Sequence, residues 1–383
     1  MIDLHQVVGI LSNLVNIESV NPDLVPGGKG EETIARHVAG ILQSAGLEVR
    51  LQETGPGRLN VLGVLRGKGG GRSLMLNGHL DTVGVAGMEA PFTARLENGL
   101  LYGRGAQDMK GGVAAALAAV LWIARNTSLH GDLVLAGVAD EEYQSAGTRA
   151  LLESGVRTDA AIVMEPTGLE VATAHKGFAW AEVETLGRAA HGSRPEEGRD
   201  AIAFMGRVLV EIERLQASLN AGPRHPLLGC GSVHASLISG GQELSSYPAR
   251  CRLSLERRLV PGEGATALER ELQEIVSRLS ARDPQFQARI TPGYSAQALE
   301  TPRDTAIVQS LRRASQGVLG REAPLGTQTF WTDAALLSEA GIPSVLFGPG
   351  GAGLHSACEY VRLDQVLQCA EILAACARDF CGA

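Results

Sequence analysis

Hydrophobic residues in the first half of the chain switch repeatedly between helical and strand-like spacing. A helical pattern that ends near Gly46 consists of Ile34, Val38, Ile41 and Leu42. Short apolar runs typical of strands lie at 47–51, 60–65, 73–80, 132–139 and 160–164. Helical stretches lie between them at 109–125 and 147–153. This alternation predicts an α/β fold, an open, mixed and mostly parallel sheet with helices on both faces.

The pattern changes between residues 177 and 291. A strand, a helix, two strands, a helix and a strand are expected there, at 178–186, 199–219, 232–238, 251–259, 265–281 and 286–290. This β-α-β-β-α-β order is typical of a ferredoxin-like α+β sandwich. After residue 291 the first pattern returns, with a strand at 344–347 and a helix from 363. We therefore expect a discontinuous catalytic domain at 1–176 and 292–383, interrupted by a second domain at 177–291.

The composition is that of an ordinary globular protein, and the net charge argues against some classes of binding partner. Of 383 residues, 44% are hydrophobic and 20% are charged, and the net charge is -8. An acidic chain disfavours nucleic acid and anionic membranes as partners. The first residues lack the pattern of a secretory signal, and the longest apolar stretch, 113–124, is too short to span a bilayer. The six cysteines show no paired spacing, so we expect reduced thiols and a cytoplasmic protein.

Polar residues at the ends of predicted strands are the candidates for chemistry, because open α/β sheets bind ligands where their strands end. His79 and Asp81 follow the run 73–80, and residues two apart in a strand project to the same side. They could be a metal ligand and the carboxylate that orients it, or a surface ion pair at a loop. The pair alone does not separate these interpretations.

Asp108 lies in a glycine-rich segment, 103–112, that leads into a predicted helix. Aspartate is a common helix N-cap, but a cap does not require four glycines nearby. A phosphate-binding loop is disfavoured because neither GxGxxG nor GxxxxGK[ST] occurs. The glycines favour a tight turn that points one carboxylate inward.

Four more candidates follow strands. Glu141 and Glu142 come after the run 132–139, and neighbours in an extended chain point to opposite sides. A metal ligand beside a general base fits this pair, as does a solvated acidic turn. Glu165 follows the run 160–164, and His355 lies in a glycine-rich loop after 344–347.

The candidate ligands share one expected location, the strand ends of one domain. They are His79, Asp108, Glu142, Glu165 and His355. Imidazole and carboxylate ligands suit zinc, cobalt or manganese. A structural zinc knot is excluded because no cysteine belongs to the set.

Five motifs resemble those of the metal-dependent amidohydrolases and peptidases that include acetylornithine deacetylase, succinyl-diaminopimelate desuccinylase, aminoacylase and glutamate carboxypeptidase. The motifs are NGHLDTV at 77–83, GRGAQDMKGG at 103–112, ADEE at 139–142, MEP at 164–166 and GLHS at 353–356. The resemblance covers essentially the whole chain. It implies two divalent metal ions, zinc first and cobalt or manganese as alternatives, and an inserted lid domain through which the protein forms a homodimer.

The resemblance also implies the arrangement of the ligands. Asp108 would bridge both metals, His79 and Glu165 would complete one site, and Glu142 and His355 would complete the other.

Two more residues receive roles from the same resemblance. Asp81 would orient the metal-binding histidine, and Glu141 would serve as general base and then general acid. In the mechanism that this implies, a metal-bound hydroxide attacks the amide carbonyl.

The predicted lid contains further matches. His191, in GRAAHGS at 187–193, resembles a lid histidine that stabilises the oxyanion in the partner subunit's active site; without the resemblance it would be an ordinary turn histidine. Arg258 resembles the arginine that binds the substrate carboxylate, with Arg257 as the alternative. Ser245 stands where many members have asparagine, so one substrate or oxyanion contact does not transfer.

The substrate expectation rests on the run TFWTD at 329–333 and the lid pattern, which look closest to acetylornithine-deacetylase-like members. We expect an N-acyl amino acid, with a dipeptide or other short peptide as the alternative. A nucleophilic-residue hydrolase is the rival enzyme class; Cys358 lies near His355, but no GxSxG elbow occurs. A non-catalytic metal-binding protein is the other rival, and Glu141 argues against it because a binder needs no base.

Overall fold

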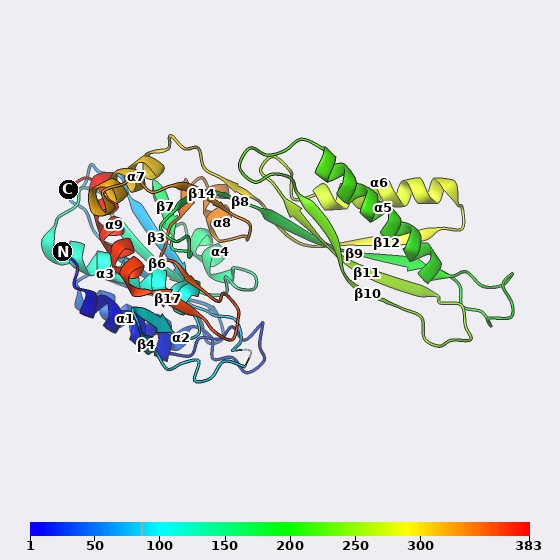
Figure 1. The fold of residues 1–383 in the computed structure, drawn as a ribbon, viewed down its shortest axis with the longest axis horizontal. Coiled ribbons are helices and arrows are strands. Elements are labelled where there is room, and N and C mark those ends of the chain that lie inside the picture. The colour runs from blue at the N-terminus through cyan, green and yellow to red at the C-terminus, as the bar shows by residue number, and fades with distance from the viewer. Residues whose placement is uncertain (86) are drawn as a thin grey trace. The chain divides into compact units, whose positions relative to one another are not determined.

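The computed structural model describes residues 1–85 and 87–383. The chain divides into two compact units. The first unit comprises Met1–Thr173, Thr301–Thr327 and Thr332–Ala383, and the second comprises Ala174–Glu300 and Gln328–Trp331. Figure 1 shows the elements of both, coloured along the chain. Relative to the expected range 177–291, the second unit extends to Ala174–Glu300 and also includes Gln328–Trp331.

Most strands of a nine-stranded sheet belong to the first unit; the order is β1-β2-β6-β3-β7-β15-β8-β13, with β14 beside β8. The strands are β1 (Glu48–Gly55), β2 (Arg58–Leu65), β3 (Leu74–His79), β6 (Leu133–Val138), β7 (Ala160–Val163), β8 (Val171–His175), β13 (Leu299–Glu300), β14 (Leu325–Gln328) and β15 (Ser344–Leu346). The predicted open, mixed α/β sheet is confirmed, but it is not mostly parallel, because antiparallel strands form both of its edges. Its parallel pairings join the central strands β6, β3, β7 and β15, and antiparallel strands flank them.

The central strands are apolar along their whole length because both faces are covered. Every residue of β3 and β6 is buried, as is usual for parallel strands between two layers of helices. The helices are α1 (Leu4–Asn16), α2 (Glu32–Ser44), α3 (Gly111–Asn126), α4 (Ala146–Glu153), α7 (Ala306–Leu319), α8 (Ala334–Glu339) and α9 (Leu363–Cys381). Within this unit, Figure 1 shows α3 and α9 on one side of the sheet and α4 and α8 on the other.

A small second sheet in the first unit was not predicted. It consists of β4 (Arg95–Glu97), β5 (Leu100–Tyr102), β16 (Gly351–Ala352) and β17 (Tyr360–Arg362), in the order β16-β17-β5-β4. Residues 360–362 pair with residues 100–102, which are far away in sequence. This pairing brings the loop between β16 and β17, which contains His355, beside the turn η1 (Ala106–Lys110), which contains Asp108.

The second unit has the predicted β-α-β-β-α-β order. Its elements are β9 (Gly177–Leu186), α5 (Ala201–Ala221), β10 (Ser232–Gly240), β11 (Arg250–Leu259), α6 (Ala267–Arg282) and β12 (Gln287–Ala296). The antiparallel sheet has the order β10-β11-β9-β12, which is the ferredoxin-like arrangement. Buried residues alternate with less buried ones along β11, because one face of the sheet packs on α5 and α6. The other face carries no helix of this unit.

Within residues 1–85 and 87–383, no helix is long and apolar enough to cross a membrane.

Candidate metal centre

The candidate ligands come from chain segments that follow the central strands of the first unit. His79 is the last residue of β3, and Glu142 and Glu165 follow β6 and β7. These three strands are parallel neighbours, so their carboxyl ends lie at one edge of the sheet. Asp108 and His355 are added by η1 and by the loop between β16 and β17. The sheet topology therefore brings together all five residues that the sequence singled out.

Asp108 lies between two imidazoles. Its Oδ1 is 3.0 Å from Nε2 of His79, and its Oδ2 is 3.3 Å from Nε2 of His355. The same nitrogen of His355 is 3.3 Å from Oε2 of Glu142. Each carboxylate oxygen of Asp108 thus faces a different histidine, which is the arrangement that a bridging carboxylate requires.

Two overlapping groups of ligand atoms converge in this region. His79, Asp108 and Glu142 offer atoms that lie within 4.8 Å of one another, and His79, Glu141 and Glu165 form a second such group. Glu141 therefore lies close enough to the cluster to act on something bound there.

His79 is held by Asp81 through the main chain. Nδ1 of His79 donates to the carbonyl oxygen of Asp81 at 2.9 Å, while the nearer carboxylate oxygen of Asp81 is 3.5 Å away. The Asp81 carboxylate accepts hydrogen bonds from the backbone N–H groups of Glu141 and Glu142, both at 3.2 Å, and from Nδ2 of Asn21 at 2.8 Å. Asp81 consequently fixes a histidine on β3 and the acidic turn after β6 at the same time.

Glu359 fixes the other half of the centre and was not singled out from the sequence. Its side chain is 1% exposed and lies 2.7 Å from Nη1 of Arg104. Its carboxylate also accepts hydrogen bonds from the backbone N–H groups of Gly105, Gln107 and Asp108, at 2.9, 2.8 and 3.0 Å. Since Glu359 follows His355 by four residues, it ties the His355 loop to the turn that carries Asp108. A glutamate in a loop has no local sequence signal for such a role.

Asp333 is a second buried acid whose position the sequence did not reveal. It is 1% exposed and accepts a hydrogen bond from Oγ1 of Thr148 at 2.6 Å. Burial raises the pKa of Asp333 to about 6. Its negative charge contributes to the raised pKa of both Glu141 and Glu165.

The glutamates of the cluster favour the protonated state. Burial, followed by the charge of Glu165, raises the pKa of Glu141 well above its usual value. Burial and the charge of Asp108 raise the pKa of Glu165 and of Glu142. Crowded buried carboxylates repel one another, and each proton or cation added to the group relieves that repulsion.

The histidines and Asp108 show the opposite tendency. Burial alone would raise the pKa of Asp108, but hydrogen bonds with His355 and His79 outweigh it and lower the pKa. Hydrogen bonds with Asp108 and Glu142 raise the pKa of His355 to about 10. Burial alone would lower the pKa of His79, yet its hydrogen bonds to Asp108 and Asp81 hold it well above the usual value.

This donor set fits divalent cations. It offers imidazole nitrogen and carboxylate oxygen, the ligands that zinc, cobalt and manganese accept. Oε1 of Glu142 is buried and has no hydrogen-bond partner among the described residues. A buried oxygen without a hydrogen-bond partner is expected where the atom serves as a ligand for a cation. Positive charge would replace the protons that the cluster otherwise takes up.

The second unit carries the remaining candidates. His191 is exposed, with Nδ1 2.8 Å from Oγ of Ser193. Ser245, which stands where many family members have asparagine, accepts a hydrogen bond at its carbonyl oxygen from the N–H of Gly192 at 2.7 Å. The loop that contains Ser245 is therefore hydrogen-bonded to the loop that contains His191.

Arg257 and Arg258 lie in different environments. The side chain of Arg257 is 1% exposed and lies 2.6 Å from Glu263 and 3.1 Å from Glu271. Arg258 is on the face without helices, its side chain is 34% exposed, and it pairs with Glu256 at 2.7 Å. Only Arg258 of the two is accessible to a ligand.

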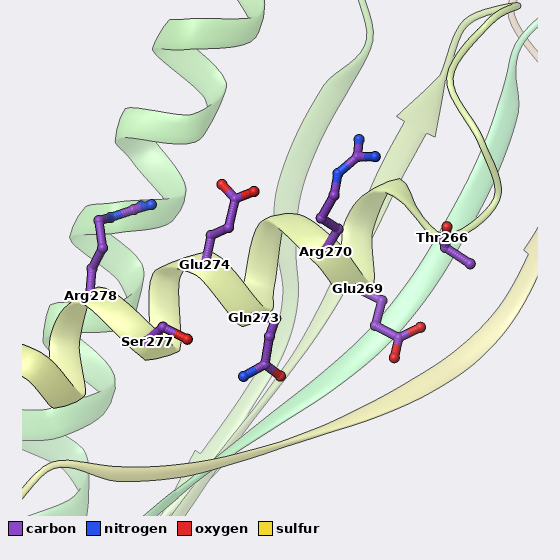
Figure 2. Close-up of a pocket in the computed structure, with 7 residues that line it drawn as sticks. All are labelled: Thr266, Glu269, Arg270, Gln273, Glu274, Ser277 and Arg278. Carbon is purple, nitrogen blue, oxygen red and sulfur yellow. The ribbon is translucent and has the colours of Figure 1, made fainter.

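Two hollows are lined mainly by residues other than the candidate ligands. One, with a volume of about 580 Å³, lies along α6 and is lined by charged and polar side chains of that helix, which Figure 2 shows. Another, of about 770 Å³, lies in the first unit beside the loop from Gly87 and includes Glu359 and Cys358. Nε2 of His355 faces Asp108 and Glu142 in this structure, which does not support a cysteine nucleophile at Cys358.

Comparisons with known proteins show the family of the chain. Residues 75–379 match the model of peptidase family M20/M25/M40. An acetylornithine deacetylase of Myxococcus xanthus is 34% identical over 89% of this chain and 90% of its own length. An N-formyl-4-amino-5-aminomethyl-2-methylpyrimidine deformylase of Bacillus subtilis is 30% identical over 91% and 89%.

Solved structures show the same fold at low sequence identity. Aminopeptidase PepT of Bacillus cereus has a TM-score of 0.81 at 18% identity and covers 99% of both chains. The YXEP protein of Bacillus subtilis, described as a dinuclear metal binding peptidase, has a TM-score of 0.75 at 15% identity and covers 98% of this chain and 97% of its own. The resemblance inferred from the motifs is confirmed: the chain is a metal-dependent amidohydrolase that belongs to peptidase family M20/M25/M40.

Proposed function

We propose that this enzyme hydrolyses the amide bond of an N-acyl amino acid at a centre of two divalent cations, with zinc as the first candidate and cobalt or manganese as alternatives. The observation that carries the proposal is the position of Asp108, with one carboxylate oxygen toward His79 and the other toward His355. A single cation would not need both oxygens.

The residues divide into two ligand sets that share Asp108. His79 and Glu165 would hold one cation, and Glu142 and His355 the other. Two contacts support this division: ligand atoms of His79 and Glu165 converge, together with Glu141, and Nε2 of His355 lies 3.3 Å from Glu142. When bound, the cations supply Lewis acidity, which polarises a carbonyl oxygen and acidifies water. Asp81 and Glu359 keep the ligands in place.

Glu141 is the proposed general base and general acid. Burial and the nearby Glu165 raise the pKa of Glu141, so this carboxylate takes up a proton more readily than an exposed glutamate does. It would accept the proton of the attacking water and deliver a proton to the leaving amine.

The second unit would contribute to substrate binding. Arg258 is proposed to hold the substrate carboxylate, because Arg257 is already committed to Glu263 and Glu271. His191 is proposed to stabilise the oxyanion in a partner subunit, and its exposure is compatible with that role.

The enzyme is also proposed to be a homodimer through the second unit. β10 is an edge strand of the four-stranded sheet, and its Leu237 and Ile238 are 73% and 57% exposed. An exposed apolar edge invites pairing with a second copy. Replacing Leu237 with lysine should shift the mass measured by light scattering from dimer to monomer. A wild-type monomer would contradict this part of the proposal.

The similarity of this chain to the acetylornithine deacetylase of Myxococcus xanthus favours an N-acyl amino acid over a dipeptide as the substrate. Human carnosine dipeptidase 1, with a TM-score of 0.76 at 19% identity, shares the fold, so a peptidase activity remains the second candidate. All six cysteines are unpaired, which supports the proposed cytoplasmic location.

One assay series tests the function. The purified chain is stripped of metal, reloaded with zinc, cobalt or manganese, and offered N-acetylornithine, other N-acetyl amino acids, N-succinyl-diaminopimelate and dipeptides. Metal-dependent release of the free amino acid from an acyl substrate is expected. Faster dipeptide cleavage would favour the peptidase, and stoichiometric metal with no hydrolysis would favour a binding protein.

A further inference from the structure

The face of the second unit that carries no helix of that unit bears a group of aromatic side chains around Arg258. Phe178 is the cross-strand neighbour of Arg258, and its ring centroid lies 5.7 Å from the guanidinium carbon. Trp180 and Tyr294 lie 5.0 and 5.6 Å from Phe178, centroid to centroid, and Trp331 lies 6.0 Å from it. We name Phe178, Trp180, Tyr294 and Trp331 the aromatic group.

Glu256 sets the orientation of both Arg258 and Trp180. Its Oε1 accepts a hydrogen bond from Nε of Arg258 at 2.7 Å, and its Oε2 accepts one from Nε1 of Trp180 at 3.0 Å. Both carboxylate oxygens are therefore engaged within the sheet. Glu256 acts as a positioning residue here.

This arrangement leaves the far end of Arg258 available. Among the described residues, neither Nη1 nor Nη2 of Arg258 donates a hydrogen bond, and the side chain is 34% exposed. The two terminal nitrogens of a guanidinium that is fixed through Nε can bind both oxygens of one carboxylate. Trp180 offers an exposed ring next to that position, because it is 44% exposed.

We propose that the aromatic group is the subsite for the side chain of the substrate amino acid, and that the preferred substrates are N-acyl derivatives of aromatic or large apolar amino acids. The inference rests on the proposed function and narrows its substrate class. A carboxylate held by Arg258 would place the adjacent side chain against aromatic rings, which favour apolar and aromatic partners.

A basic side chain such as that of ornithine fits this surface poorly. Arg258 already supplies a positive charge beside the rings, and Glu256, whose carboxylate bonds to Trp180, is already engaged by Arg258. An ammonium group placed there would be repelled by the charge of Arg258.

The test compares hydrolysis of N-acetylphenylalanine, N-acetylalanine and N-acetylornithine by the full-length, metal-loaded enzyme. The wild type should prefer N-acetylphenylalanine. Trp180→Ala should lower kcat/KM for this substrate about tenfold, mainly through KM, as expected for the loss of about one aromatic contact. N-acetylalanine hydrolysis should fall much less than N-acetylphenylalanine hydrolysis, and Trp180→Phe should restore most of the preference.

Trp122→Ala is the matched control, since Trp122 lies on α3 of the first unit and should leave the ratio of the two substrates unchanged. Preference for N-acetylornithine, or an equal loss on all substrates in Trp180→Ala, would overturn the inference and leave the proposed function standing. Failure to hydrolyse any N-acyl amino acid with any of the three metals would overturn both.

Discussion

Replacing Glu359 with glutamine should weaken both the first unit and its metal centre. The wild-type carboxylate accepts from Arg104 and from three backbone N–H groups of residues 105–108. Glutamine is nearly the same size, but one of its two terminal groups is an N–H donor. Whichever way the amide turns, a donor faces Arg104 and the N–H of Gly105, or faces the N–H groups of Gln107 and Asp108.

The cost follows from the burial of the ion pair. Arg104 and Glu359 are each 1% exposed, and removing one partner of such a pair costs about 3–5 kcal/mol. We expect a loss of unfolding free energy near the lower limit, about 3 kcal/mol, because Nη2 of Arg104 keeps its bond to the carbonyl oxygen of Ser356 at 2.9 Å. Loss of a residue that orients ligands typically lowers metal affinity by about 10–100-fold.

Urea denaturation in the presence of a chelator gives the stability change, and competition with a chromophoric chelator gives the zinc affinity. Glu97→Gln is the matched control, since Glu97 forms an exposed ion pair with Arg95 and should change stability by less than about 1 kcal/mol. If Glu359→Gln behaved like Glu97→Gln in both measurements, the assigned positioning role of Glu359 would be refuted.

Three further outcomes are expected. Glu141→Gln should keep both metals by elemental analysis yet lose about two to four orders of magnitude in kcat, and loss of metal would instead make Glu141 a ligand. Arg258→Gln should raise KM for an N-acyl amino acid but not for the corresponding amide, which has no carboxylate; equal effects on both would contradict the assignment. Zinc affinity should rise with pH from about 6 to 9. The pKa of His355 is raised to about 10, so zinc must displace a proton from this histidine in order to bind. A pH-independent zinc affinity would contradict this.

The parts of the fold that were predictable have strong local patterns. β3 and β6 are continuous apolar runs because helices cover both faces of the sheet, and β11 alternates because one of its faces lacks helices. The sheet formed by β4, β5, β16 and β17 was missed, since its strands are two or three residues long and its two halves are joined by β5 and β17, which are more than two hundred positions apart. Hydrophobic periodicity carries little information over so few residues.

The same contrast holds for the candidate site. The proposed ligands follow strands or lie in glycine-rich segments, so position in the chain pointed to them. Glu359, Asp333 and Asn21 act through contacts with residues distant in sequence, such as the bond from Asn21 to Asp81. These roles can be recognised only in the three-dimensional structure, where the contacting residues lie together.

The central claim is that Asp108 bridges two cations, and a zinc-soaked crystal measured at the zinc absorption edge tests it most directly. Two anomalous peaks are predicted, one beside His79 and Glu165 and the other beside Glu142 and His355, with a carboxylate oxygen of Asp108 next to each. A single peak, or two peaks of which one lies away from Asp108, would contradict the account.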